Sequence, residues 1–490
     1  SEGMITILNP SAEMGQGSMT ALAVLIAEEM DADWSKVRVE QSPIDPKIYG
    51  RPGWGGRGYH MITVGSMTVS GYFMPLRQAG AKARYVLMKN AAMKWKLPFS
   101  ELKTEPNMVI HRPTNQRMSY GEIASFAKPL KDIPDIPGKN LKRPEEFRLI
   151  GKIVPRIDIP EKVDGSAIYS MDVKVPNMLY ATILRTPVNG NKPINFNEKE
   201  IRSMTGIQET VILKHGVAIL GKHYEDLLLA KRNLKVNWSQ GSNAEMFNSE
   251  KVFEEYRRVV GSQKKRSHVL TQKGDTVSGL QKAERTYSAD FLSDHVYHAQ
   301  MEPLNAVVAV NSAGDGAEIW AGTQSPTGAI KEVAKLLKTS PSNIKLNPCM
   351  LGGGFGRRSM SDFIVEAADL SKAVRNPVKL IWSREDDIQY GAFRPMCLQR
   401  LDAGLDVDGN LIAWQHSIIG DRRRLLSSGA KIPYYEIPNQ HIEIIGLNHG
   451  VRLKHWRAVG HGFTKFAIEA FIDEIAASEG VDSYQFHRRV

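Results

Sequence analysis

The chain has 490 residues, of which 42% are hydrophobic and 24% charged, a balance typical of a globular protein rather than of a disordered or fibrous one. At roughly 100 to 200 residues per domain, this length predicts several packed domains. The formal net charge is +11, but the basic runs at 263–268, 421–424 and 486–490 are short and scattered, so we expect solvated surface and no nucleic-acid partner.

No apolar run approaches the roughly 20 residues that cross a bilayer, so we do not expect this chain to span a membrane. Its only cysteines, Cys349 and Cys397, have neither CxxC spacing nor a partner cluster. They can therefore form neither a thiolate zinc site nor an iron–sulfur cluster, and any such cluster must belong to another chain. We interpret both as buried small hydrophobic residues, with a disulfide as the alternative.

The first part of the chain is predicted to be α+β. Apolar residues recur at helical spacing over 19–30 and 71–95, and a strand pattern covers 37–40. Residues 1–127 are therefore assigned to a first domain. Four prolines and several charges between 128 and 144 break both periodicities, so 128–147 is predicted to be a linker.

Short strand patterns then dominate residues 148–240, which predicts a compact α/β domain. The strand-like runs lie at 166–173, 178–186, 209–216, 217–224 and 234–238, with a helix-like run at 226–233. A polar, turn-rich stretch at 239–251 marks the next boundary. Residues 250–490 alternate strands and helices and are assigned to a further domain, in which Ser325-Pro326 starts a helix.

Two motifs suggest metal binding but have simpler interpretations. DVDGN at 406–410 begins like a calcium loop but lacks the glutamate at the twelfth position, so we predict a hairpin turn. HVYH at 295–298 has no third ligand in reach, and structural roles are expected for both histidines.

A glycine-rich loop, CMLGGGFGRR at 349–358, follows a strand pattern at 344–346 and precedes a helix. Glycines there let the backbone approach a ligand, and N–H groups at a helix start suit an anion such as a pyrophosphate. A tight turn without a ligand is the alternative. Arg357 replaces the third glycine of GxGxxG, so this is not a dinucleotide fingerprint.

Three other loops place glycines before helices: EMGQGSMT at 13–20, TVGSMT at 63–68 and HWRAVGHGF at 455–463. Gln16 offers two donors and an acceptor that could contact a heterocycle or an oxo group. Arg457 could anchor a phosphate or a substrate carboxylate, and a surface ion pair is the alternative.

Together with AGTQSPTG at 321–328, these loops resemble the xanthine dehydrogenase and aldehyde oxidoreductase family of molybdenum hydroxylases. The GQG loop comes first here, an order typical of isoquinoline 1-oxidoreductase large subunits and membrane-associated aldehyde dehydrogenases. Residues 150–187 resemble the start of the family's hammerhead domain. The resemblance covers nearly the whole chain and implies α+β molybdopterin-binding domains, with an inserted α/β hammerhead domain at 148–240.

The resemblance also implies roles for individual residues. The implied catalytic residues are Gln324 near the molybdenum, Phe355 beside it and Arg457 on the substrate side. The implied cofactor-binding residues are Gly15, Gln16, Gly17, Gly65, Ser66, Gly352, Gly353, Gly354, Phe355 and Gly356. No protein side chain is expected to bind the metal, because in this family the pterin dithiolene holds it.

The implied reaction is molybdenum-dependent hydroxylation of an N-heteroaromatic carbon or oxidation of an aldehyde, with water supplying the oxygen. The implied cofactor is molybdopterin cytosine dinucleotide, and electrons would pass to a small [2Fe–2S] subunit. A cytochrome c partner and a periplasmic location, or the periplasmic face of the inner membrane, are further expectations. Ser359 stands where purine-oxidising relatives carry a glutamate, so purines are not expected as substrates.

The family's catalytic glutamate lies in a GEP-type loop, and this sequence contains none before Val490. The nearby carboxylates are not expected to be the base: Glu13 is interpreted as a cap or a salt-bridge partner, Glu302 as a structural acceptor, and Asp362 as a residue that caps or begins the next helix. We therefore expect the base to come from a C-terminal continuation or a second chain. A non-catalytic cofactor-binding subunit is the alternative, and a nicotinamide-dependent dehydrogenase lacks its GxGxxG motif.

Overall fold

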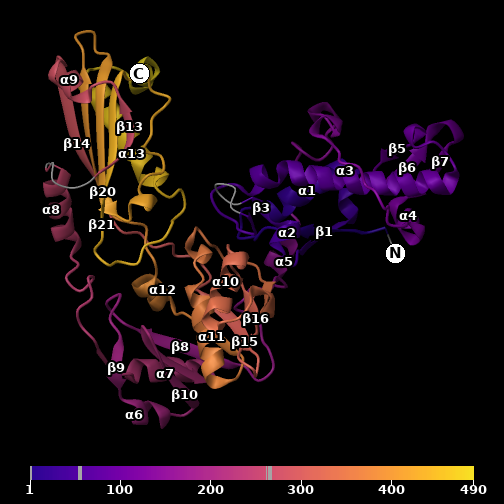
Figure 1. Cartoon of the computed structure of the whole chain (residues 1–490), viewed down its shortest axis with the longest axis horizontal. Coiled ribbons are helices and arrows are strands. Elements are labelled where there is room, and N and C mark those ends of the chain that lie inside the picture. Colours follow the sequence, from indigo (N-terminus) through magenta and orange to yellow (C-terminus); the bar gives the residue numbers. More distant parts are fainter. Residues whose placement is uncertain (1–2, 53–57, 261, 263–266) are drawn as a thin grey trace. The chain divides into compact units, whose positions relative to one another are not determined.

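The computed structural model describes residues 3–52, 58–260, 262 and 267–490 (Figure 1). The chain forms two compact units, each built from separate stretches of sequence. Unit 1 comprises Ser1–Asn177, Asn305–Gly354 and Ser361–Val378, and unit 2 comprises Met178–Leu304, Phe355–Met360 and Lys379–Val490. The chain passes from unit 1 to unit 2 inside the GGGFG sequence, between Gly354 and Phe355.

The N-terminal part of unit 1 is built around two helices, α1 (Ser18–Met30) and α3 (Thr68–Trp95), which lie side by side (Figure 1). Gly80 permits this packing, because a Cβ atom there would lie 2.4 Å from the carbonyl oxygen of Ile26. Strands β1 (Ile5–Asn9) and β2 (Val37–Gln41) pair in parallel beside α1. These elements confirm the helices predicted at 19–30 and 71–95 and the strand predicted at 37–40.

Smaller elements complete this part of unit 1. They are α2 (Pro46–Tyr49), β3 (Arg51–Pro52), β4 (Tyr59–His60), β5 (Lys103–Glu105), β6 (Met108–His111), β7 (Gln116–Ser119), α4 (Tyr120–Phe126) and α5 (Ile159–Asp164). Strands β5, β6 and β7 form an antiparallel sheet. A buried apolar cluster lies between that sheet and the C-terminal half of α3; its members include Ala91, Val109 and Ile123.

The second part of unit 1 contains a strand–helix–strand unit. Strand β16 (Ala317–Ala321) runs antiparallel to β15 (Asn305–Val310) and parallel to β17 (Ile344–Pro348). Helix α10 (Pro326–Leu337) makes the crossover between β16 and β17, as parallel strands require. The loops that follow β16 and β17 therefore leave the same edge of the sheet. Helix α11 (Asp362–Val374) packs on β15.

Unit 2 contains a sheet in which the neighbouring strands are β10 (Ile207–Leu213), β11 (Gly216–Gly221) and β8 (Leu179–Arg185), in that order. Strand β18 (Val378–Ile381) lies next to β8. Helix α7 (Tyr224–Asn233) packs on it through Leu227 and Ala230. A short sheet joins β9 (Pro193–Phe196) and β12 (Val236–Trp238). The strand patterns of the predicted α/β domain thus form strands, with one exception described below.

The other sheet of unit 2 has the order β13–β21–β20–β19–β14. Its strands are β13 (His268–Lys273), β14 (Arg285–Ser293), β19 (Cys397–Leu405), β20 (Leu411–Asp421) and β21 (Asn439–Leu447). Helix α13 (His461–Ser478) covers it through a large buried cluster that includes Trp414, Phe471 and Ile472. The remaining helices are α6 (Glu198–Arg202), α8 (Ser249–Val260), α9 (Thr276–Gln281), α12 (Arg384–Tyr390) and α14 (Ser483–Arg489).

Two local predictions had opposite outcomes. The hairpin at 406–410 is confirmed, because the Asp406 carboxylate accepts the N–H groups of Asp408 and Asn410 between β19 and β20. The strand predicted at 166–173 is wrong, since the segment forms turns and a single bridge at Tyr169. The carboxylate of Asp172 accepts the N–H of Tyr169 and folds the segment back instead of letting it extend.

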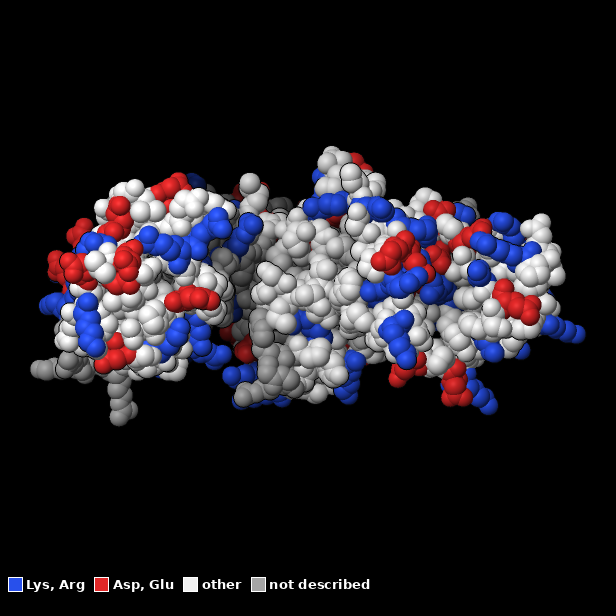
Figure 2. Space-filling view, turned by 90° about the horizontal axis from the view of Figure 1, so that it is seen from above, with Lys and Arg blue, Asp and Glu red and all other residues white. Residues whose placement is uncertain are grey.

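The cysteines and the charged surface also bear on the sequence interpretation. Both cysteines are described and neither forms a disulfide. Cys397 is fully buried as predicted, and burial raises the pKa of its thiol to about 12, whereas Cys349 is only partly buried, so the prediction is wrong for that residue. On the face shown in Figure 2, Lys and Arg side chains are mixed with Asp and Glu and with uncharged residues. Residues 263–266 of the first basic run lie outside the described residues. Within the described ranges, no helix is both long and apolar enough to cross a membrane.

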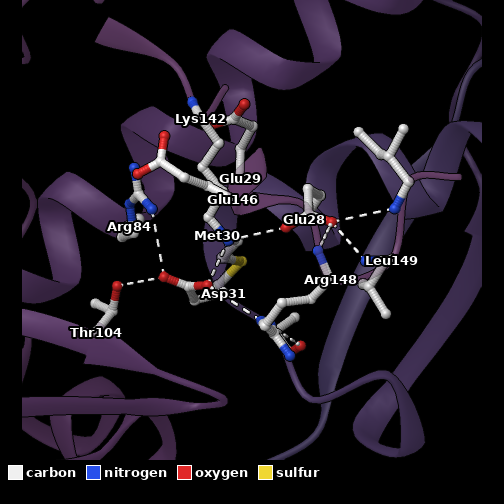
Figure 3. Close-up of polar contacts among 12 residues, drawn as sticks. Glu28, Glu29, Met30, Asp31, Arg84, Thr104, Lys142, Glu146, Arg148 and Leu149 are labelled. Atoms are coloured by element: carbon white, nitrogen blue, oxygen red, sulfur yellow. Dashed lines mark hydrogen bonds and ion pairs between the residues drawn. The ribbon is translucent and has the colours of Figure 1, made fainter. Parts of the chain in front are cut away.

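A buried ionic network holds the end of the Pro-rich segment on α1 (Figure 3). One carboxylate oxygen of Glu28 accepts the N–H groups of residues 148–150 at 2.6 to 3.1 Å. Lys142 bonds to the carboxylates of both Glu28 and Asp31, and Asp31 also contacts Arg84. The end of the Pro-rich segment is thus held on α1 by charged side chains that have partners of opposite charge.

These partners control the protonation of the buried carboxylates. Burial by itself favours the neutral form of Glu28, but hydrogen bonds from the Leu149 N–H and from Lys142 hold its pKa below the usual value. For Asp31, burial is likewise outweighed by hydrogen bonds from Lys142 and Thr104, and the pKa is again lowered. Both groups are therefore ionised at neutral pH.

We expect Glu28→Ala to lower the free energy of unfolding by about 3 to 5 kcal/mol, because it removes one of the two carboxylates that pair with Lys142 and leaves three partly buried N–H groups without their acceptor. The control is Glu40→Ala, which removes an exposed ion pair with Arg38 and should cost less than about 1 kcal/mol. Urea unfolding followed by fluorescence measures both.

The sign of the pH dependence follows from the lowered pKa of Glu28. Its contribution is present above the ordinary pKa of 4.5 and is lost as the pH falls through the lower folded value. The difference between wild type and Glu28→Ala should therefore shrink on acidification below that pH. Equal losses in the Glu28 and Glu40 variants at pH 7 would contradict the network's role.

Candidate functional site

Two of the predicted loops in unit 1 are joined at Thr63 and Gln324. The Thr63 N–H donates to the Gln324 carbonyl oxygen at 2.8 Å, and the Gln324 side-chain Nε2 donates back to the Thr63 oxygen at 2.9 Å. Met61 N–H donates to Thr327 Oγ1 at 3.0 Å. The loop at 61–66 therefore lies along the segment that follows β16, and the buried Gln324 is held in one orientation.

The other two loops of unit 1 meet the first pair at Gly354. A Cβ atom on Gly354 would lie 2.7 Å from Gln324 Oε1 and 2.9 Å from Met14 Sδ. The N–H of Leu351 donates to the carbonyl oxygen of Glu13 at 3.2 Å. Three of these loops thus meet at Gly354 within one unit, with the fourth bonded to Gln324, and a side chain at position 354 would have to displace Gln324 or Met14.

The GQG loop takes its shape from the buried carboxylate of Glu13. Its oxygens accept the N–H groups of Gly15, Gly17 and Met19 at 2.8, 3.1 and 3.0 Å. The interpretation of Glu13 as a cap is confirmed. Gln16 closes the loop further, because its side chain accepts the N–H of Met14 and donates to the Ala12 oxygen. A contact between Gln16 and a ligand stays a prediction.

Several residues at the tips of these loops have left-handed backbone conformations. Gly15 has a φ of 101°, and Gly65 and Ser66 follow one another at 66° and 56°. Gly353 has a φ of 97°. Where two such residues follow one another, as at Gly65 and Ser66, successive N–H groups can face one side, which suits an anion. Buried side chains such as Gln324 and Glu13 hold the loops, and Gly15, Gln16, Gly65 and Ser66 are exposed at their tips.

The part of the glycine-rich sequence in unit 2 has its own contacts. Phe355 is 38% exposed with a φ of 51°. A Cβ atom on Gly356 would lie 2.3 Å from the carbonyl oxygen of His455, so the loop that carries Arg457 passes directly against Gly356. Arg457 itself is exposed ahead of α13. The catalytic assignments of Phe355 and Arg457 stay predictions.

The two arginines after Gly356 are fully buried. Arg358 Nη2 donates to the carbonyl oxygen and to Oε2 of Glu302, both at 2.9 Å. The interpretation of Glu302 as a structural acceptor is thus confirmed. Asp362 is the first residue of α11, with Ser361 at the N-cap position, which confirms the predicted helix start.

The histidines of HVYH have the structural roles expected from the sequence. His295 Nδ1 contacts the Arg394 oxygen at 2.9 Å, and His298 Nε2 contacts the His455 oxygen at 2.8 Å. Burial lowers the pKa of His298 to about 4, so its ring is neutral at pH 7. Among the residues that the structure describes, no cluster of three or more His, Cys, Asp or Glu side chains could hold a metal ion.

Comparison with known proteins assigns both ends of the chain to the same kind of cofactor-binding domain. Models of the molybdopterin cofactor-binding domain match residues 1–139 and 260–490. The chain is 33% identical to the beta chain of isoquinoline 1-oxidoreductase of Brevundimonas diminuta, over 99% of this chain and 68% of that protein. It is 30% identical to a membrane-bound aldehyde dehydrogenase of Gluconacetobacter polyoxogenes, over 99% of this chain and 65% of that protein.

A third relative and two solved structures extend the comparison. A nicotinate dehydrogenase subunit of Pseudomonas putida is 27% identical, over 99% of this chain and 41% of that protein. Quinoline 2-oxidoreductase from Pseudomonas putida 86 superposes with a TM-score of 0.58 at 16% identity, over 69% of this chain and 49% of its own. Aldehyde oxidoreductase from Desulfovibrio gigas gives a TM-score of 0.58 at 17% identity, over 84% and 46%.

The chain therefore belongs to the xanthine dehydrogenase and aldehyde oxidoreductase family of molybdenum hydroxylases, which are molybdopterin-dependent oxidoreductases. The structural neighbours confirm the predicted α+β fold of that family. The chain spans about two thirds of the first two relatives and less than half of the third and of the superposed structures.

The loops of unit 1 fit a molybdopterin. The turn at Gly65 and Ser66 brings two successive left-handed residues to one loop tip, and the carboxylate of Glu13 is turned inward, where it accepts the N–H groups of its own loop. Around Gly15, a Cβ atom would meet nothing within 4 Å. The surface thus combines close backbone approach with open space.

We expect Gly354→Ala to weaken cofactor retention by about five- to 150-fold, because a methyl group there must displace Gln324 or Met14 at a cost of about 1 to 3 kcal/mol. Molybdenum and pterin bound per chain after gel filtration measure the effect. Gly462→Ala is the control, since its Cβ would lie no closer than 3.9 Å to another atom. Unchanged content in Gly354→Ala would show that the convergence is irrelevant to the cofactor.

Proposed function

We propose that this chain binds molybdopterin cytosine dinucleotide and belongs to an enzyme that hydroxylates an N-heteroaromatic carbon or oxidises an aldehyde. The convergence of four loops on Gly354 and Gln324 supports this most directly. The names of its relatives include isoquinoline, nicotinate and aldehyde as substrates. Ser359 in place of an acidic side chain argues against purines.

Backbone groups of unit 1 would hold the cofactor. The N–H groups around Gly65, Ser66 and Gly353 would bind its anionic groups, whereas the Gly15 N–H is engaged by Glu13 and the open space at Gly15 would admit the cofactor. When bound, the cofactor supplies the oxidising metal centre, and water supplies the oxygen incorporated into the product. Gln324, held by Thr63 with its Oε1 towards Gly354, would orient and polarise polar atoms at the reacting end of the cofactor.

Other subunits would complete the reaction. Neither cysteine is part of a cysteine pair or cluster, so electrons would pass to a separate [2Fe–2S] subunit, with a cytochrome c as a further acceptor. Glu13 and Glu302 are already engaged with backbone amides and with Arg358. The base that removes a proton during hydroxylation would therefore come from another segment or subunit.

The first experiment measures metal and pterin in the complex purified with its partners. We expect about one molybdenum and one pterin dinucleotide per copy of this chain, and reduction of an artificial acceptor with a quinoline or an aldehyde but not with xanthine. Full activity without molybdenum would refute the proposal. Residues 1–490 alone, loaded with cofactor, should turn over neither substrate; turnover would show that one of the carboxylates discussed above acts as the base.

A substitution at Gln324 separates cofactor binding from chemistry. We expect Gln324→Ala to lower turnover per bound molybdenum by about 100-fold, the effect typical of removing a polarising amide, with molybdenum content nearly unchanged. Gln78→Ala is the matched control, because it removes a side-chain bond to Ile136 elsewhere in unit 1. Parallel losses of metal and turnover in Gln324→Ala would instead assign Gln324 a purely structural role.

A further inference from the structure

A segment of unit 1 that follows the Pro-rich stretch lies against the back of the GQG loop. The N–H of Ile157 donates to Thr20 Oγ1 at 3.1 Å. Arg156 Nη1 donates to the carbonyl oxygen of Gly15 at 3.1 Å, across 141 residues of sequence. The GQG loop is therefore contacted from outside by a part of the chain that the motif itself does not contain.

The guanidinium of Arg156 is held in one plane by Asp158. Arg156 Nε donates to Asp158 Oδ1 at 3.0 Å and Nη2 to Oδ2 at 2.6 Å, a bidentate pairing that fixes both position and orientation. Asp158 is 1% exposed and also accepts a bond from Lys162 at 2.6 Å. Because the fork is locked on one side, the remaining nitrogen is aimed at Gly15.

The charge of Asp158 persists across the pH range in which proteins are folded. Burial favours its neutral form, but hydrogen bonds from Arg156 and Lys162 outweigh this and lower the pKa of Asp158 to about 2. The alignment of Arg156 is therefore the same at pH 5 and at pH 8.

Arg156 also contacts the two other features that shape the loop. Its Nη2 lies 3.5 Å from Glu13 Oε1, the oxygen that accepts the N–H groups of Gly15 and Gly17. A Cβ atom on Gly17 would lie 3.6 Å from the guanidinium carbon. The back of the loop is thus packed against a fixed cation, whereas the surroundings of Gly15 are open.

We propose that Arg156, aligned by Asp158, is a positioning residue that sets the GQG loop in the form it presents to the cofactor. The identity of the ligand rests on the proposed function, whereas the bracing of the loop does not. If the loop is already ordered before the cofactor binds, the loss of conformational entropy on ordering the loop no longer weakens binding. Arg156 would therefore influence cofactor retention without touching the reacting atoms.

The test compares four variants of the full chain in complex with its partners. Arg156→Ala removes the brace, Arg156→Lys keeps the charge but not the fork, and Asp158→Asn keeps Arg156 but weakens its alignment. Arg117→Ala is the matched control, because Arg117 forms an exposed ion pair with Glu105 in the same unit. Amide hydrogen exchange is followed for residues 14–19 and, for comparison, along α3, and pterin content is measured in parallel.

We expect exchange at Gly15, Gly17 and Met19 to be about tenfold faster in Arg156→Ala, the effect of losing a charge-assisted contact, with α3 unchanged. Arg156→Lys and Asp158→Asn should be intermediate and Arg117→Ala silent. Pterin content should fall in the same order. If Arg156→Ala does not fold, the intermediate effect of Asp158→Asn decides the outcome.

Exchange that is unchanged at residues 14–19, or raised equally along α3, would overturn the bracing role. Local acceleration with full pterin content would overturn the link between bracing and cofactor. A wild-type complex that holds no pterin would refute the proposed function, while the exchange measurement would still decide whether Arg156 braces the loop.

Discussion

The close approach of three loops at Gly354 constrains the rest of unit 1. Gln324 and Met14 occupy the volume that a side chain at position 354 would need. That contact forms because β16 and β17 are parallel and release their loops at the same sheet edge. Helix α10 connects the two strands. The hydrogen bonds between Thr63 and Gln324 hold the Gln324 side chain at this sheet edge.

Buried carboxylates join the distant pieces of this unit. Glu13 gathers the amides of its own loop, Glu28 holds residues 148–150 on α1, and Asp158 aligns Arg156 towards Gly15. Hydrogen bonds from amides or cations lower the pKa of Glu28 and of Asp158, and a buried carboxylate is costly to leave unpaired. Such groups give a unique arrangement to segments whose apolar contacts alone would allow several.

Much of the fold could be predicted from local sequence, because periodicity and turn chemistry act over a few residues. This holds for α1, α3 and the hairpin at 406–410, and the glycine motifs with their order along the chain identified the family. The segment at 166–173 has the composition of a strand, but Asp172 supplies a competing local turn. The bond from Arg156 to Gly15 and the bond from Gln324 to Thr63 have no local signal. Only the tertiary structure decides such contacts, because they depend on which distant segments the parallel sheet and the buried charges bring together.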